Sequence, residues 1–171
     1  MKGPKYYTEW INIVDGYFKS LSPDVATYEF GTSFVVMGVL TVAYCITNKQ
    51  ESVINKMANH LPEVIAIFFG FSFTLMTIIG QIKENVKGDS KKQKLYREFE
   101  KLILQLAFEG VIEIALLLVI FAYKAIALVI TPSIFITTVF MSIELFMINF
   151  IFLAMIRAIS VLALSYLQND T

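Results

Sequence analysis

Apolar residues fill four long stretches of this chain, and polar residues gather in the short segments between them. A membrane-crossing helix needs about 20 predominantly apolar residues. Only Thr131-Pro132-Ser133 separates the last two stretches, so we expect these to fold back on each other as a helical hairpin. The pattern predicts an all-α, polytopic membrane protein with four transmembrane helices. The predicted spans are about 24–46, 62–82, 104–130 and 133–157.

The first segment of the chain has a different pattern, because polar residues interrupt it at helical spacing. Its apolar and aromatic residues fall at i, i+3, i+4 positions: Tyr7, Trp10, Ile11, Val14, Tyr17, Phe18 and Leu21. Trp and Tyr favour the membrane–water interface, so we expect residues 1–22 to form an amphipathic helix in the headgroup plane. Docking against a partner protein is the alternative. The segment lacks the features of a cleaved secretory signal, so we expect it to be retained.

Helix starts and turns are marked by proline, glycine and short polar residues. Ser22-Pro23-Asp24 combines an N-cap, a first-turn proline and an acid near the positive end of the helix dipole. Leu61-Pro62-Glu63 predicts a second start, which makes 48–60 a short polar connection or a surface half-helix. Val86 to Ser90 predicts a turn, since Gly88 can take a positive φ. Residues 23–171 then form one transmembrane domain.

The distribution of Lys and Arg predicts the orientation. The charged segment 83–101 holds seven of them, the 48–60 connection holds two, and the turn at Thr131 holds none. Loops rich in Lys and Arg stay in the cytoplasm. We therefore expect a multi-pass protein of the cell inner membrane with the 83–101 segment and both termini in the cytoplasm.

Composition excludes several functional classes. The chain is 57% hydrophobic, against about 45–50% for soluble domains, so no room remains for a soluble catalytic domain. The net charge is zero, which does not favour nucleic-acid binding. Cys45 and His60 are the only residues of their kinds, too few for a disulfide-exchange pair, a structural zinc site or bis-histidine haem ligation. Enzyme motifs such as HExxH and GxSxG are also absent. We expect no enzyme activity, no cofactor and no metal.

Charged residues inside the last two apolar stretches are the main functional candidates. They are Glu109, Glu113, Lys124, Glu144 and Arg157. Charges at membrane depth are costly and usually pair or line a pathway. At about 1.5 Å per residue, Lys124 lies roughly 12 Å and Glu144 roughly 18 Å below the turn of the hairpin. The sequence thus permits one ion pair of Lys124 with Glu144, and another of Arg157 with Glu109 or Glu113.

Two interpretations of these charges follow. In the structural one, the pairs neutralise each other and fix the register of two helices. In the functional one, Glu144 lines a polar path with Asn149 and Glu113, either between helices or at an oligomer axis. A separate signal concerns packing, because small residues at four-residue spacing let helices approach closely. This small-residue face comprises Ala66, Gly70 and Thr74.

The leading functional hypothesis is a non-enzymatic bacterial protein that self-associates in the lipid bilayer as a homo-oligomer and forms a polar or ion-permeable assembly. The alternative is a membrane anchor or sensor subunit that recruits a cytoplasmic partner, for example in a bacterial stress or phage-defence system. A third possibility is a minimal proton-coupled transporter that uses Glu144. This transporter would require a dimer, because four helices enclose little volume.

Overall fold

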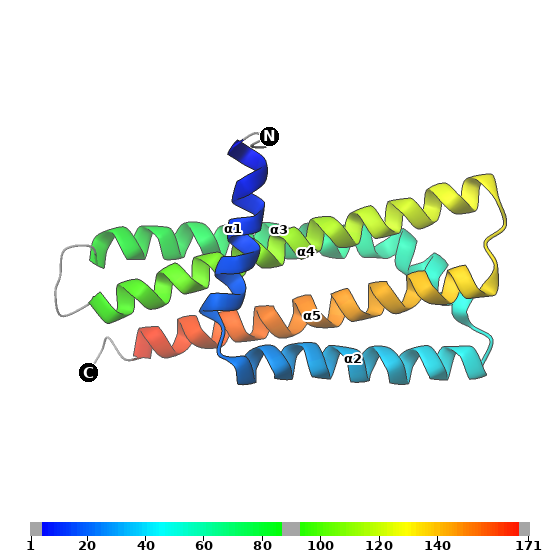
Figure 1. The fold of residues 1–171 in the computed structure, drawn as a ribbon, viewed down its shortest axis with the longest axis horizontal. Helices are drawn as coiled ribbons and strands as arrows, with labels where there is room; N and C mark the ends of the chain where they lie inside the picture. Colours follow the sequence, from blue (N-terminus) through cyan, green and yellow to red (C-terminus); the bar gives the residue numbers. More distant parts are fainter. Residues whose placement is uncertain (1–4, 87–92, 168–171) are drawn as a thin grey trace.

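Four long helices lie side by side, and a shorter N-terminal helix crosses them (Figure 1). The structure, a computed structural model, describes residues 5–86 and 93–167. In that part of the chain there are five helices: α1 (Lys5–Ser20), α2 (Pro23–Ile46), α3 (Gln50–Val86), α4 (Gln93–Val129) and α5 (Ile134–Leu167). Each of α2 to α5 contains a stretch long and apolar enough to span a membrane. The predicted all-helical architecture with four candidate spans is therefore confirmed.

The start and end of α2 follow from local backbone chemistry. Ser22 is the N-cap, and its hydroxyl accepts a hydrogen bond from the backbone N–H of Val25 at 3.4 Å. Beyond the other end, Asn48 has a φ of 51°, a conformation that asparagine tolerates better than most residues. The N–H groups of Asn48 and Lys49 then bond to carbonyls of the last turn at 3.2 and 3.0 Å. This cap turns the chain directly into α3.

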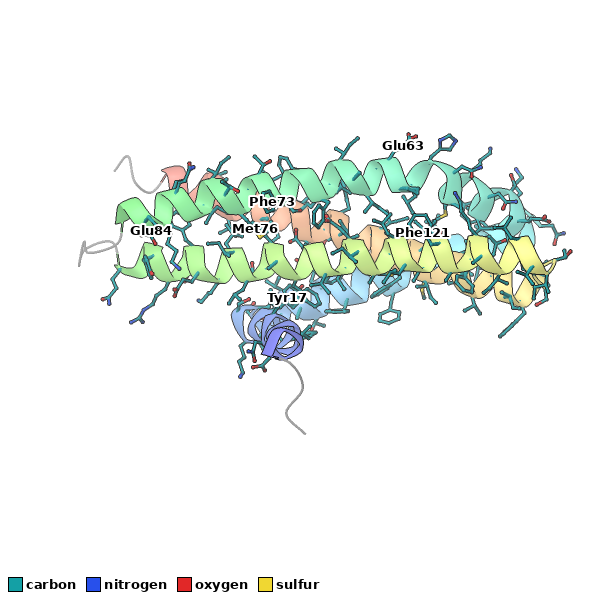
Figure 2. The ribbon with its side chains drawn as sticks, turned by 90° about the horizontal axis from the view of Figure 1, so that it is seen from above. Tyr17, Glu63, Phe73, Met76, Glu84 and Phe121 are labelled. Atoms are coloured by element: carbon teal, nitrogen blue, oxygen red, sulfur yellow. The ribbon has the colours of Figure 1, made fainter. Side chains whose placement is uncertain are left out.

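The prediction that a new helix starts at Pro62 is wrong, because α3 runs from Gln50 through Pro62 without a break. Segment 50–60 is likewise not a surface half-helix, since Ile54 is fully buried against Tyr123 and Met141. A proline inside a helix costs about 3 kcal/mol, and burial of the preceding turns offsets that cost. The helix bends in this region (Figure 1). Glu63, just after the proline, lies on the outer side of α3 (Figure 2).

The segment between α3 and α4 is only partly described. Apart from Val86, the turn predicted at 86–90 lies outside the described residues. The next helix, α4, begins at Gln93 and continues to Val129, so it starts in the charged segment and runs into the apolar stretch as predicted.

The crossing of α1 over α4 divides the bundle into two parts. Tyr17 is 0% exposed, and its ring stacks on Phe108 with the centroids 4.0 Å apart. Figure 2 shows this tyrosine at the junction of α1 with α4. Gly16 lies at this contact, where a Cβ would stand 3.4 Å from the Leu104 side chain and a larger side chain would collide with it. Beyond this level α3, α4 and α5 continue without α2 (Figure 1). We call this part the three-helix end; its apolar core includes Ile79 and Phe99.

The surface of the four long helices is apolar over most of its length. Large exposed side chains occur on every one of them, including Phe34, Val39, Ile67, Phe73, Leu118, Phe121, Phe135 and Phe152. In α2 the usual arrangement of a soluble amphipathic helix is inverted, since the two buried residues are Glu29 and Ser33. A soluble monomer rarely exposes so much contiguous apolar surface.

Candidate functional site: buried polar residues in the helix bundle

Arg157 on α5 is the centre of a buried polar cluster. Its Nε donates a hydrogen bond to Oε1 of Glu29 on α2, at 2.5 Å. Its Nη1 donates to the side-chain oxygen of Gln105, and its Nη2 lies 3.8 Å from Oε1 of Glu109, both on α4. Glu29 and Glu109 are 2% and 0% exposed. The Arg157–Glu109 pair that the sequence permits is therefore present, but the closer carboxylate partner belongs to α2.

The helix α1 contributes two polar contacts to this cluster. The Tyr17 hydroxyl donates to Oε2 of Glu29 at 3.1 Å, and the Gln105 amide donates to the Ser20 hydroxyl at 3.1 Å. The guanidinium of Arg157 also lies 5.9 Å from the centre of the Tyr17 ring. Burial, followed by the nearby Glu29 carboxylate, raises the pKa of the Tyr17 phenol, so the hydroxyl keeps its proton and remains a donor. One end of α1 is thus fixed to α2, α4 and α5.

Polar contacts also join α2 and α5 along the middle of α2, from Glu29 to Thr41. The Asn149 amide donates to the Ser33 hydroxyl at 3.1 Å, and the Thr41 and Ser142 hydroxyls share a hydrogen bond of 3.1 Å. Together with the Glu29–Arg157 pair, these contacts form what we call the α2–α5 polar seam. Inter-helix hydrogen bonds of this kind hold helices together where lipid removes the hydrophobic driving force.

Two acids in the interior lack a cationic partner among residues 5–86 and 93–167. The Ser72 hydroxyl donates to Oε1 of Glu113 at 3.4 Å, whereas Oε2 of Glu113 has no hydrogen-bond partner. Glu144 is 0% exposed, and neither of its oxygens has a hydrogen-bond partner in the described part of the chain. On α5 it stands between Met141 and Ile151, which belong to two separate apolar clusters. Glu144 is therefore a carboxyl group enclosed by apolar packing.

The ion pair between Lys124 and Glu144 is not formed. Both oxygens of Glu144 are unpartnered, and Lys124 instead lines a pocket with Asn55 and Asn59 of α3. The rise per residue places the two residues about 6 Å apart in depth, which their side chains can span, but depth does not determine the direction in which a helix presents a side chain. Glu144 shares the buried face of α5 with Met141, and Lys124 projects beside α3 instead.

The charges in the interior do not balance. Within residues 5–86 and 93–167 the buried acids are Glu29, Glu109, Glu113 and Glu144. Among the described residues, Arg157 is the cation that contacts these acids. It lies within 4 Å of Glu29 and Glu109 but not of Glu113 or Glu144. An ionised carboxylate left unpaired in a protein interior costs several kcal/mol. Glu113 and Glu144 are therefore suited to take up a proton or a monovalent cation. The described residues bring no three His, Cys, Asp or Glu side chains together as a metal-binding group.

The small-residue face lies on the outside of the chain. Ala66, Gly70 and Thr74 are all exposed, and a Cβ added at Gly70 would meet no atom within 4 Å. The Thr74 hydroxyl donates to the Gly70 carbonyl of its own helix at 2.8 Å. Because all three residues are exposed in the described part of the chain, close packing on this face stays a prediction that involves another molecule.

Several members of the cluster were not predicted from the sequence. They are Tyr17 as a hydrogen-bond donor, Ser20, Glu29, Ser33, Ser72 and Gln105. A usable signal was present on α2. Glu29 and Ser33 fall at i and i+4, which places both polar residues on the same side of a mostly apolar helix.

No family model matches this chain, and no curated protein and no solved structure matches it either. The buried polar residues are therefore the main indication of its function.

Proposed function

We propose that this chain is a multi-pass membrane protein that conducts or exchanges protons along the acids inside its own helix bundle. The membrane location is supported by the apolar side chains that cover the outside of α2 to α5. The 24 residues of α2 extend about 36 Å at about 1.5 Å per residue, against about 30 Å for the hydrocarbon core of a bilayer. The crossing helix α1 lies near the start of α2, at the level expected for a membrane surface.

The orientation proposed here places the three-helix end in the cytoplasm of a bacterial cell and the structure in the inner membrane. Exposed ion pairs occur at that end, between Lys83 and Glu100 at 3.0 Å and between Lys101 and Glu98 at 3.1 Å. Segment 83–101 is also the richest in Lys and Arg, which favours the cytoplasmic side.

The observation that carries the functional proposal is the isolation of Glu144. At about 1.5 Å per residue it lies about 15 Å from the start of α5 and about 20 Å from Arg157, which is near the middle of the proposed membrane. A purely structural acid at that depth needs a partner, and Glu144 has none among the described residues. Intramembrane acids commonly mark proton or ion routes.

The other polar groups extend from Glu144 in both directions along the bundle. Toward the three-helix end, Glu113 and Glu109 lie one helical turn apart on α4 and lead to Arg157. Toward the opposite end, Ser142 and Thr41 form the last contact of the α2–α5 polar seam. Because these acids lie inside one chain, this route does not need an oligomer axis. Self-association through the small-residue face is a separate proposal. No cofactor and no enzymatic chemistry enter this function.

The test is proton flux into proteoliposomes that contain the purified chain and an internal pH-sensitive dye. A potassium gradient with valinomycin provides the driving force. Wild-type protein is expected to admit protons faster than empty liposomes, and Glu144→Gln is expected to abolish the difference. Glu63→Gln is the matched control, because Glu63 lies on the outer side of α3, and it should conduct like the wild type. Equal flux in wild-type and empty liposomes, or in wild type and Glu144→Gln, would contradict the proposal.

Recruitment of a cytoplasmic partner is the second candidate function, and the three-helix end favours it. This end continues beyond α1 with its own apolar core around Ile79 and Phe99, although spanning the membrane does not require it. Exposed charges such as Arg97 lie on it. Crosslinking in intact cells followed by identification of the captured protein tests this function. Capture of one specific protein should be lost in Arg97→Glu and kept in Glu144→Gln. The same yield from both variants would contradict it.

A further inference from the structure

The pocket that Lys124 lines lies between α3 and α4, far from the three-helix end. Its volume is about 260 Å³, and it is lined by Asn55, Ala58, Asn59, Tyr123, Lys124, Ala127 and Leu128. Lys124 lies about 8 Å from the end of α4 at about 1.5 Å per residue. In the proposed membrane orientation this depth corresponds to the outer interfacial region. The pocket shares no residue with the acids of the proposed proton route.

The polar groups of this pocket are suited to an anion. The Lys124 ammonium group and the side-chain amides of Asn55 and Asn59 all offer N–H donors. No carboxylate lines the pocket, and no ion pair within the described residues involves Lys124. At this interfacial depth, a lysine without an acidic partner is available to bind an anion. An anionic ligand would supply the missing charge.

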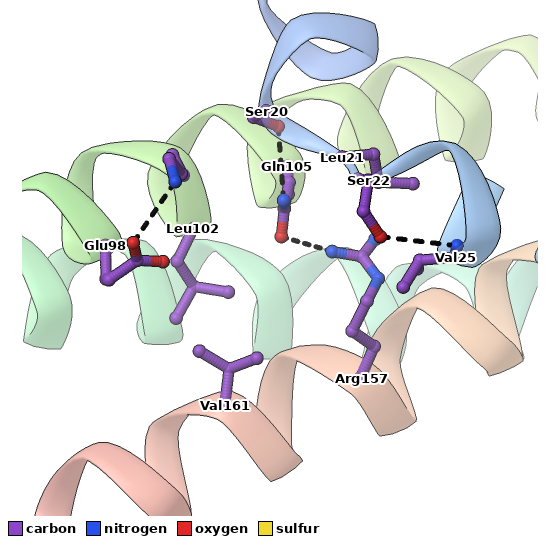
Figure 3. Close-up of a pocket in the computed structure, with 10 residues that line it drawn as sticks. Ser20, Leu21, Ser22, Val25, Glu98, Leu102, Gln105, Arg157 and Val161 are labelled. Atoms are coloured by element: carbon purple, nitrogen blue, oxygen red, sulfur yellow. Dashed lines mark hydrogen bonds and ion pairs between the residues drawn. The ribbon is translucent and has the colours of Figure 1, made fainter.

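The pocket near α1 is a useful contrast, because its cations already have partners. It has a volume of about 130 Å³ and is lined by Arg157 and Lys101 together with Gln105 and Ser22 (Figure 3). Lys101 pairs with Glu98, and Arg157 pairs with Glu29. That pocket therefore does not require an anion, although it contains two cationic side chains.

The walls of the Lys124 pocket indicate the source of the anion. Ala58, Ala127 and Leu128 contribute apolar groups to the pocket, and the interfacial depth of Lys124 in the proposed membrane orientation is the depth at which lipid phosphate groups lie. A phosphate group with an attached hydrocarbon chain matches a pocket with donors on one side and apolar residues on the other. We propose that this pocket binds the phosphate group of an anionic phospholipid. The proposal relies on the membrane location but not on proton transfer.

Lipid titration of the full chain in a neutral detergent tests this binding. The probes are phosphatidylglycerol, phosphatidylcholine and inorganic phosphate, and the readouts are native mass spectrometry and the melting temperature. Phosphatidylglycerol is expected to bind and to raise the melting temperature more than phosphatidylcholine does. Lys124→Gln should weaken its binding about tenfold, the usual effect of losing one charge-assisted hydrogen bond. Lys101→Gln on the same helix should bind like the wild type.

Two further variants keep the test decisive. Lys124→Arg retains the cation and should restore binding. Asn59→Asp leaves Lys124 in place but adds a carboxylate at an exposed position, so it should abolish binding even if Lys124→Gln fails to fold. If inorganic phosphate competes at millimolar concentration and the protein shows no preference among the lipids, the pocket binds a soluble anion. That result would overturn its assignment to a phospholipid. Equal phosphatidylglycerol binding by the wild type, Lys124→Gln and Asn59→Asp would overturn the proposal.

Discussion

Replacement of Arg157 by methionine is expected to be the most destabilising single change in the polar cluster. Methionine retains much of the apolar stem but leaves Glu29 and Glu109 without a cation within 4 Å. Removing one partner of a buried ion pair typically costs about 3–5 kcal/mol, because the other charge remains buried. The lost hydrogen bond to Gln105 is included in this range. We expect Arg157→Met to fall in the same range.

A double-mutant cycle separates the cost of unpaired charge from the cost of lost packing. Glu29→Gln keeps an acceptor for the Tyr17 hydroxyl, and Arg157 keeps Glu109 at 3.8 Å, so this variant should lose only about 1–2 kcal/mol. If unpaired charge dominates, Glu29→Gln combined with Arg157→Met should be more stable than the sum of the two losses predicts. Interaction energies of directly contacting residues are about 0.5–3 kcal/mol, and we expect a value in the upper half of this range.

The assay is reversible unfolding in mixed micelles titrated with sodium dodecyl sulfate, followed by far-ultraviolet circular dichroism. Arg97→Met is the matched control, because Arg97 is an exposed arginine on the three-helix end, and its effect should stay within about 0.5 kcal/mol. Losses that add to within about 0.5 kcal/mol in the cycle would refute the charge argument. A loss below about 1 kcal/mol for Arg157→Met would refute it as well, because the buried carboxylates would then not depend on the guanidinium.

Four other substitutions test separate features by the same unfolding assay, by tryptophan fluorescence or by proteolysis. Glu144→Leu should leave stability unchanged or raise it by about 1–2 kcal/mol, since it replaces an unpartnered buried acid with an apolar side chain; a clear loss would reveal a structural partner. Tyr17→Phe should cost about 1–2 kcal/mol, and fluorescence of the single tryptophan, on α1, should report looser docking; an unchanged spectrum and stability would contradict this. Gly16→Leu should displace α1 because the Leu104 side chain occupies the space, whereas Gly31→Leu, which faces open space, should not; similar proteolysis of α1 in both would disprove the close contact. Asn48→Val should cost about 1–2 kcal/mol because valine tolerates a positive φ poorly, while Asn48→Gly should be tolerated; equal stability of the two would count against the helix cap.

The fold was predictable where it depends on local signals. The four apolar stretches are long enough to determine the number of candidate spans, and Ser22-Pro23-Asp24 determines where α2 begins. The start of α3 was not predictable from Pro62 alone. A proline that would end an isolated helix is tolerated inside α3, because the residues before it, such as Ile54 and Ala58, are buried in the bundle. This burial depends on contacts with other helices, and the residues around Pro62 alone do not indicate it.

The polar cluster was predictable only in part, for a geometric reason. Position along a helix follows from a constant rise per residue, and this estimate brought Arg157 to the level of Glu109. Rotation about the axis depends on how neighbouring helices pack, so Lys124 and Glu144 do not pair, although their difference in depth is within the reach of their side chains. Glu29 was missed because the mean hydropathy of α2 is high and does not show that Glu29 and Ser33 lie on the same side of the helix.

The contacts of α1 also imply an order of assembly during synthesis. This helix is the first of the five to be translated, but the surface that receives Tyr17 consists of Phe108 on α4 and Phe150 on α5. Glu29 likewise leaves the ribosome well before Arg157, its partner on the last helix. For most of translation the nascent chain therefore carries an undocked amphipathic helix and an acid without its counter-charge. The helix gains its main contact when α4 is in place, and the acid gains its cation only with α5, so the two are satisfied one after the other.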